Sequence, residues 1–167
     1  DCGGVYLTVS DQNAVAHCYE QLAIRFGPRV NVAQMVEPGV EFAFGAVIDP
    51  DFGPLVMVGL GGTLVEFLGD NVVALAPFDE GHAARLLNRL KGRRLLDGIR
   101  GTQKADVASL AQALARFSML AASLQHEFES IDVNPIISVP TGAVAVDALV
   151  IAKSIGTTIH PGGETYD

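Results

Sequence analysis

Cysteine is scarce in this 167-residue chain, which contains only Cys2 and Cys18. The two cysteines form no Cys-x-x-Cys or Cys/His pattern, so neither a disulfide framework nor a zinc site is indicated. A chain of this length buries roughly 68–70% of the surface that its unfolded form exposes, so a sizeable core can form without such crosslinks. We therefore expect a protein of a reducing compartment, the cytoplasm.

Positive charge is also scarce. Lysine and arginine together number 11 against 19 aspartates and glutamates, which gives a formal net charge of -8. Because the chain has no basic stripe, we expect no nucleic-acid partner. An anionic ligand such as a nucleotide would need a divalent metal ion, helix N-termini or backbone N–H groups to neutralise its charge.

Long hydrophobic runs are missing as well. Residues 54–60 form one of the longest apolar runs, which is far shorter than the roughly 20 residues of a membrane-spanning helix. No charged segment followed by an apolar one opens the chain, so neither a signal peptide nor a membrane partner is expected. The chain starts at Asp1 rather than at methionine, within a loop-like stretch, and we interpret it as a fragment.

Apolar residues make up 49% of the chain, and their spacing predicts its secondary structure. A helix is predicted over residues 12–26, capped by Ser10 or Asp11 and ended by Gly27-Pro28. Strands are predicted over residues 30–36, 40–48 and 55–58, with a turn at residues 49–53.

The second half of the chain changes from strands to helices. The predicted elements are a hairpin of residues 64–68 and 72–75, helices over 79–90 and 105–124, a short turn at 93–96, and two strands flanking a turn at 140–142. The long helix has an apolar stripe formed by Leu110, Leu114, Phe117, Leu120 and Leu124. This order predicts an α+β fold, with a mostly antiparallel sheet and helices on one face.

A glycine cluster, Gly59-Leu60-Gly61-Gly62, follows the third predicted strand. A dinucleotide-binding fingerprint would need a third spaced glycine and a following helix, whereas residues 63–68 have the pattern of a strand. The cluster therefore favours a tight bend or bulge between strands over a backbone cradle for phosphate.

The closing hairpin carries polar residues at regular positions. Alternation places Asp132 and Asn134 on one face of their strand and the apolar residues between them on the other. Across the turn, Asp147 interrupts an apolar strand and is expected to approach Asn134. Such oxygen ligands suit Mg²⁺, which takes its remaining ligands from water and substrate phosphates. The alternative is that these residues only face solvent, and alternation alone does not decide.

A third candidate site lies at the end of a predicted strand, at Gln34, Met35 and Val36, and Glu41 follows Gln34 by seven residues. A strand edge of this kind can offer main-chain N–H and C=O groups to an adenine ring, while a carboxylate accepts hydrogen bonds from two ribose hydroxyls. Spacing alone favours the alternative, in which Glu41 is an outward-facing strand residue.

Several stretches together resemble one known family. They are Asp1-Cys2-Gly3-Gly4-Val5, Glu37-Pro38-Gly39-Val40-Glu41, Asp49-Pro50-Asp51-Phe52-Gly53-Pro54, Gly59-Leu60-Gly61-Gly62 with Val65-Glu66, Leu95-Leu96-Asp97-Gly98-Ile99-Arg100-Gly101, Asp132-Val133-Asn134-Pro135 and Ala145-Val146-Asp147-Ala148. In this order they resemble the ATP-grasp domain of ADP-forming acyl-CoA synthetases, such as ADP-forming acetate:CoA ligase, which are relatives of the succinyl-CoA synthetase beta chain. The resemblance spans roughly residues 1 to 150.

The resemblance implies a domain layout and a role for each candidate residue. Residues 1–36 would be a remnant of the N-terminal ATP-grasp subdomain with the hinge, residues 37–155 the C-terminal subdomain, and residues 156–167 a flexible tail. Gln34, Met35 and Val36 would contact adenine and Glu41 the ribose of ATP or ADP. Asn134 and Asp147 would be the Mg²⁺ ligands, and Asp132 would face a phosphohistidine during phosphoryl transfer.

The resemblance also implies an activity. Relatives join a carboxylic acid to CoA while ATP is cleaved to ADP and phosphate, through acyl phosphate and phosphohistidine intermediates. Their nucleotide-contacting lysine segment and phosphorylatable histidine precede the Asp-x-Gly-Gly-Val stretch, where this chain begins. We therefore expect the chain alone to be inactive and to need a CoA-binding portion, fused or separate, while homo-oligomer formation stays open.

Two other functions stay open at this point. One is a nucleotide-sensing regulatory module, as in proteins where the same region is joined to a lysine acetyltransferase and has lost ligase activity. The other is a structural assembly domain that uses its strands as a subunit interface. The residues preceding Asp1 would discriminate the first of these from a ligase, because an intact histidine there favours catalysis.

Overall fold

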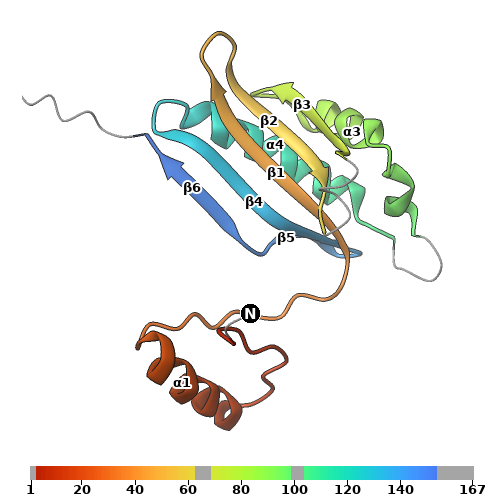
Figure 1. Cartoon of the computed structure of the whole chain (residues 1–167). Coiled ribbons are helices and arrows are strands. Elements are labelled where there is room, and N and C mark those ends of the chain that lie inside the picture. The colour runs from red at the N-terminus through yellow and green to blue at the C-terminus, as the bar shows by residue number, and fades with distance from the viewer. Residues whose placement is uncertain (1–2, 63–68, 99–103, 154–167) are drawn as a thin grey trace, which may run out of the picture. The chain divides into compact units, whose positions relative to one another are not determined.

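The computed structural model describes residues 3–62, 69–98 and 104–153. The chain divides into two compact units between Glu37 and Pro38 (Figure 1). The predicted strand over residues 64–68 and the predicted tail over residues 156–167 lie outside the described residues. The two units are described separately below.

The first unit contains one helix, α1, over Gln12–Phe26, as the sequence predicts. The side chain of Asp11 caps it by accepting a hydrogen bond from the backbone N–H of Ala14 at 2.9 Å. The helix ends at Gly27, whose N–H donates to the carbonyl of Ala23. Both boundaries are thus set by local residues.

The strand predicted over residues 30–36 is absent, and that prediction is wrong. Residues 29–39 carry no helix or strand, and they form no ladder with any described residue. Val32 and Met35 are exposed rather than buried in a sheet. An apolar, β-branched sequence favours an extended backbone, but a strand exists only where a neighbouring strand supplies the hydrogen bonds.

The second unit is built on an antiparallel sheet, six-stranded in the part of the chain that is described. Its strands are β1 (Val40–Asp49), β2 (Gly53–Leu60), β3 (Asn71–Leu75), β4 (Phe128–Val139), β5 (Gly142–Ala145) and β6 (Ala148–Ala152). They follow the order β3-β2-β1-β4-β5, and β6 pairs with β4 next to β5. The predicted closing strand is therefore two strands.

Three helical segments cover one face of this sheet (Figure 1). They are α3 (Glu80–Arg89), the 3-10 helix η1 (Arg93–Asp97) and α4 (Val107–Ser123). Asp79 and Asp106 cap α3 and α4 through their side chains. The architecture confirms the predicted α+β fold with helices on a single face. Among the described residues of this second unit no helix lies on the other face, which we call the uncovered face.

The hydrophobic core lies between the sheet and the helices. Phe42 and Phe44 of β1 are fully buried, and the Phe44 ring lies 5.7 Å from that of Phe117 on α4. The predicted stripe on α4 is wrong at one position, since Leu120 is 46% exposed and Ala121 is buried instead. A period of 3.6 residues carries the stripe from Phe117 to Ala121 and rotates Leu120 toward solvent.

One buried carboxylate joins the sheet to the helices. Asp70, immediately before β3, is 4% exposed. Its two carboxylate oxygens accept hydrogen bonds from the backbone N–H groups of Lys91, at 2.8 Å, and Gly92, at 2.7 Å. A Cβ at Gly92 would collide with the side chain of Leu60 on β2. Asp70 and Gly92 therefore fix the loop after α3 against the sheet.

Candidate functional site

The uncovered face of the sheet carries the acidic residues that the sequence singles out. On β1, Phe42 is buried toward the helices, so Glu41 before it lies on the opposite face. On β4, Ile131 is buried and the adjacent Asp132 is exposed. Alternation thus brings Glu41 and Asp132 to the same uncovered face, on neighbouring strands.

Asn134 and Asp147 lie beside each other, as the sequence predicts. The backbone N–H of Asn134 donates to the carbonyl of Asp147 at 3.1 Å. The next pair along the two segments is Val133 with Ala148, so Asn134 and Asp147 occupy opposite positions. Asp147 lies between β5 and β6 rather than inside a strand, which differs from the prediction.

The side chains of this pair are available to a ligand because both residues are exposed. One oxygen of Asp147, Oδ1, accepts a hydrogen bond from the N–H of Ala148 at 2.9 Å, which restrains the carboxylate. Within residues 3–62, 69–98 and 104–153, no group of three or more histidine, cysteine or acidic side chains could hold a metal ion. A cation at Asn134 and Asp147 would therefore need oxygens from water or a ligand as well.

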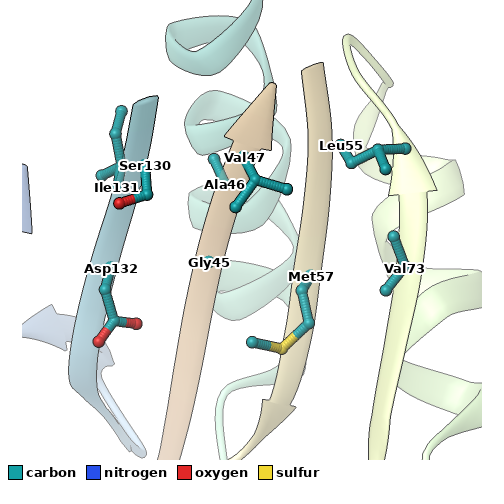
Figure 2. Close-up of a pocket in the computed structure, with 9 residues that line it drawn as sticks. All are labelled: Gly45, Ala46, Val47, Leu55, Met57, Val73, Ser130, Ile131 and Asp132. Carbon is teal, nitrogen blue, oxygen red and sulfur yellow. The ribbon is translucent and has the colours of Figure 1, made fainter. Parts of the chain in front are cut away.

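A hollow of about 340 Å³ lies on the uncovered face, over strands β3, β2, β1 and β4 (Figure 2). Gly45 of β1 lies at its centre, paired with Met57 on one side and Asp132 on the other. Val73 of β3 contributes to its far side, and the lining is almost entirely apolar. Because Gly45 has no side chain, the hollow is open next to the carboxylate of Asp132.

The other predicted contacts fall in two different places. Gln34, Met35 and Val36 belong to the first unit, in its stretch without helix or strand. Gln34 and Met35 are exposed and Val36 is partly buried. Glu41 belongs to the second unit, where it pairs with Ile137 of β4. Their nucleotide-binding roles stay predictions.

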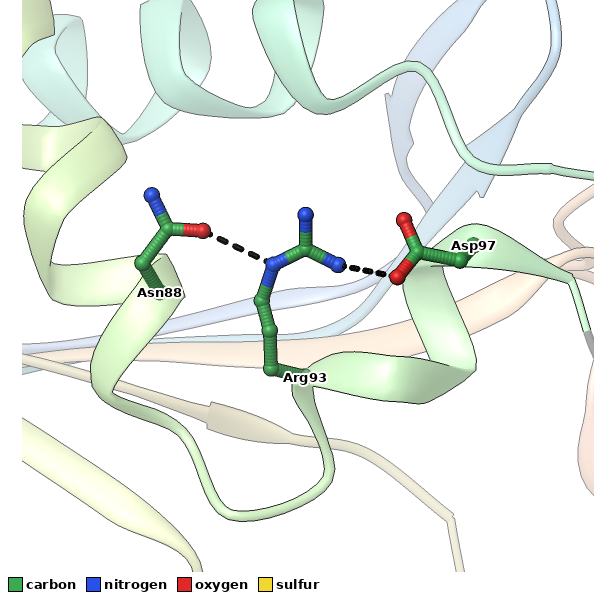
Figure 3. Close-up of polar contacts among 3 residues, drawn as sticks. All are labelled: Asn88, Arg93 and Asp97. Carbon is green, nitrogen blue, oxygen red and sulfur yellow. Dashed lines mark hydrogen bonds and ion pairs between the residues drawn. The ribbon is translucent and has the colours of Figure 1, made fainter.

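An arginine orders the segment after α3 (Figure 3). Arg93 donates from Nε to Oδ1 of Asn88 at 2.8 Å and from Nη1 to Oδ2 of Asp97 at 2.7 Å. The hydrogen bond from Arg93 is the main cause that lowers the pKa of the Asp97 carboxyl below its ordinary value of 3.8. The charges of Arg93 and Lys104 act in the same direction, and partial desolvation opposes them.

This ion pair predicts a defined acid dependence of stability. The pKa of Asp97 is lower in the folded protein than its ordinary value of 3.8. The ionised Asp97 therefore stabilises the fold fully at pH values above the pKa of the unfolded chain, and this stabilisation is lost as the pH falls through the pKa of the folded protein. The free energies of unfolding of wild type and Asp97→Asn, measured in urea, should differ by a constant amount around neutral pH. This difference should shrink below about pH 4. Asp51→Asn, at an exposed turn residue, is the control. A difference that grows on acidification would contradict the assignment.

Two features of the site were not predicted from the sequence. The hollow depends on Gly45 facing Met57 and Asp132 across two strand pairs, and no local pattern indicates it. The second feature is the contact of Gly61 and Gly62 with Glu41, since the N–H of Gly61 donates to the Glu41 carbonyl at 2.6 Å. The glycine cluster was the available signal, but its partner lies twenty residues earlier in the chain.

Comparisons with known proteins agree with this architecture. A family model described as an ATP-grasp domain matches residues 1–151. The acetate–CoA ligase [ADP-forming] I of Archaeoglobus fulgidus is 36% identical over 155 residues, which are 88% of this chain and 22% of that protein. The beta subunit of acetate–CoA ligase [ADP-forming] I from Pyrococcus furiosus is 32% identical over 159 residues, covering 90% of this chain and 68% of the subunit.

A solved structure is similar over most of the chain. It is an acetyl-coenzyme A synthetase of Candidatus Korarchaeum cryptofilum, with a TM-score of 0.83 and 33% identity over 92% of this chain and 70% of that one. It contains coenzyme A and Mg-AMPPCP, with its phosphohistidine segment pointing towards the nucleotide-binding site.

None of the helices in the described part of this chain combines the length and the apolar composition of a membrane-spanning helix.

Proposed function

Because this chain belongs to the ATP-grasp domain family of ADP-forming acyl-CoA synthetases, we propose that it is the nucleotide-binding portion of such an enzyme. The enzyme would form acyl-CoA from a carboxylic acid, CoA and ATP, and would release ADP and phosphate. The observation that carries the proposal is the backbone hydrogen bond that holds Asp147 beside Asn134 of β4. β4 belongs to the same sheet as Glu41, and it also carries Asp132.

A magnesium ion fits the chemistry of this pair. An amide oxygen and a carboxylate are hard ligands, and their small number suits Mg²⁺, which keeps waters and binds substrate phosphates. Asn134 and Asp147 would hold the ion, and the ion would supply positive charge against the polyphosphate. A chain with a net charge of -8 and few basic residues needs such a source of positive charge.

The remaining residues would bind and orient the nucleotide. The main chain at Gln34, Met35 and Val36 would contact adenine, and the exposed carboxylate of Glu41 would accept hydrogen bonds from the ribose hydroxyls. Such contacts hold the nucleotide in place for phosphoryl transfer, which depends mainly on alignment and on charge neutralisation.

Asp132 would orient the histidine that receives the γ-phosphoryl group. Its carboxylate can accept a hydrogen bond from one imidazole N–H, which leaves the other ring nitrogen free to attack phosphorus as ADP departs. The open hollow beside Asp132 supports this assignment, because it leaves room for a side chain from elsewhere in the enzyme. The histidine itself would belong to a segment outside this chain.

The complete enzyme would contain a CoA-binding portion, in the same polypeptide or in a partner subunit. Both arrangements fit the comparisons, since this chain spans 68% of a beta subunit but only 22% of a longer relative. The scarcity of cysteine supports a cytoplasmic location.

Phosphorylation of the complete enzyme with Mg-ATP labelled on the γ-phosphate tests the proposal. We expect a label that is acid-labile and base-stable, as a phosphohistidine is, and that is released when ADP is added. Nucleotide binding in calorimetry without labelling would favour the sensing module instead. Failure to bind Mg-ADP at all would contradict the proposed function.

A further inference from the structure

The two glycines after β2 lie directly against Glu41. Gly61 donates its N–H to the Glu41 carbonyl at 2.6 Å, which ties the chain after β2 to the start of β1. This bond lies next to the last β1–β2 pair, Phe42 with Leu60. Gly61 therefore has a fixed position relative to Glu41, although the two residues are far apart in the sequence.

Gly61 leaves no space for a side chain beside Glu41. A Cβ at Gly61 would lie 2.9 Å from the Cβ of Glu41, 3.0 Å from its carbonyl carbon and 3.0 Å from the nitrogen of Phe42. Two of these neighbours are backbone atoms of a paired strand and cannot move easily. The close approach thus requires glycine, and it closes one side of the Glu41 side chain.

Gly62 lies near the other end of the same side chain. Its φ of +88° is a conformation that favours glycine, and a Cβ there would lie 3.4 Å from Oε2 of Glu41. The described residues donate no hydrogen bond to the Glu41 carboxylate and place no cation beside it. Glycine at both positions therefore keeps the space beside the Cβ and Oε2 of Glu41 free of side-chain atoms from residues 61 and 62.

We propose that Gly61 and Gly62 position the carboxylate of Glu41 for the ribose of the bound nucleotide, and so contribute to the choice of ribose over 2′-deoxyribose. The inference rests on the proposed function, because it takes the ligand to be a nucleotide. Gly61 and Gly62 are positioning residues here, and Glu41 alone touches the ligand. Orienting the carboxylate before binding lowers the entropy that is lost when the ribose hydroxyls bind.

Binding of Mg-ADP and Mg-2′-deoxy-ADP to the complete enzyme, measured by calorimetry, tests this role. A hydrogen bond to a charged group is worth about ten-fold or more in affinity, so wild type should prefer Mg-ADP by about that factor. Glu41→Ala should reduce the preference to about one. Gly62→Ala places a methyl group against Oε2 at a φ that disfavours alanine and should reduce the preference, and Gly62→Asn, which tolerates positive φ better, should reduce it as well.

Gly53→Ala is the matched control. Gly53 also has a positive φ, +83°, but nothing lies within 4 Å of a Cβ there, so the variant reproduces the backbone strain without touching Glu41. Its ribose preference should equal that of wild type. In a Glu41→Ala background, Gly62→Ala should cause no further loss of preference, because the two changes act through one side chain.

The possible failures are distinguishable. If Glu41→Ala loses the preference and both Gly62 variants keep it, the positioning role is wrong while the proposed function stands. If Glu41→Ala keeps the preference, the ribose contact and this inference both fail. If wild type binds neither nucleotide, the proposed function fails as well.

Discussion

Asp147→Ala is expected to reduce Mg-dependent phosphorylation of the complete enzyme by about 100-fold or more, the largest effect among the variants considered. Asp147 lies opposite Asn134 and offers the only carboxylate of that pair. Without it, the neutral amide of Asn134 would face the metal and the polyphosphate alone. Single-turnover labelling from γ-labelled ATP at several Mg²⁺ concentrations measures the effect.

The same series contains its own checks. Raising the Mg²⁺ concentration should restore part of the Asp147→Ala activity, because weakened metal binding is the cause. Glu129→Ala removes another exposed carboxylate of β4, and it should leave labelling unchanged. Undiminished labelling by Asp147→Ala would overturn the assignment of the metal ligands.

Asp70→Ala is expected to cause the largest loss of stability, about 3 kcal/mol, and to lower Tm by about 6–12 °C. The variant deletes two hydrogen bonds from backbone N–H groups to a buried carboxylate, those of Lys91 and Gly92. Both donors would be left without their partner in a part-buried loop. Urea unfolding followed by circular dichroism measures the change.

Asp79→Ala provides the comparison for Asp70. The Asp79 carboxylate also accepts a backbone hydrogen bond, from His82, but Asp79 is an exposed helix cap. Its removal should cost about 1 kcal/mol, a typical value for an N-cap. If Asp70→Ala costs no more than Asp79→Ala, burial of the Asp70 carboxylate does not contribute as described.

Elements fixed by neighbouring residues could be predicted from the sequence. The helix over Gln12–Phe26 was predicted at both ends, because Asp11 and Gly27 act within one turn. The strand predicted over residues 30–36 failed, since a strand depends on a partner that no local pattern reveals. The separate β6 strand, which the prediction merged with β5 into one closing strand, was not recognised for a related reason. It lies at the sheet edge with every residue exposed, so it lacks the alternation that marks a half-buried strand.

The candidate site could likewise be predicted only in part. Alternation placed Asp132 and Asn134 on one face of their strand, and the nearby turn placed Asp147 beside Asn134. The Gly61–Glu41 contact could not be predicted, because it depends on how β1 and β2 end relative to each other. The family resemblance supplied the roles of these residues, which spacing alone left open.

Because the helices lie on one face of the sheet, residues on the two faces are under different evolutionary constraints, stability on one face and ligand binding on the other. Buried side chains such as Phe42 and Val58 face the helices, and substitution there costs stability. Side chains around the hollow, such as Met57 and Val73, lie on the face that no described helix of the second unit covers, so we expect their exchange to cost folding little. A protein built in this way can acquire new ligand preferences while its scaffold is conserved.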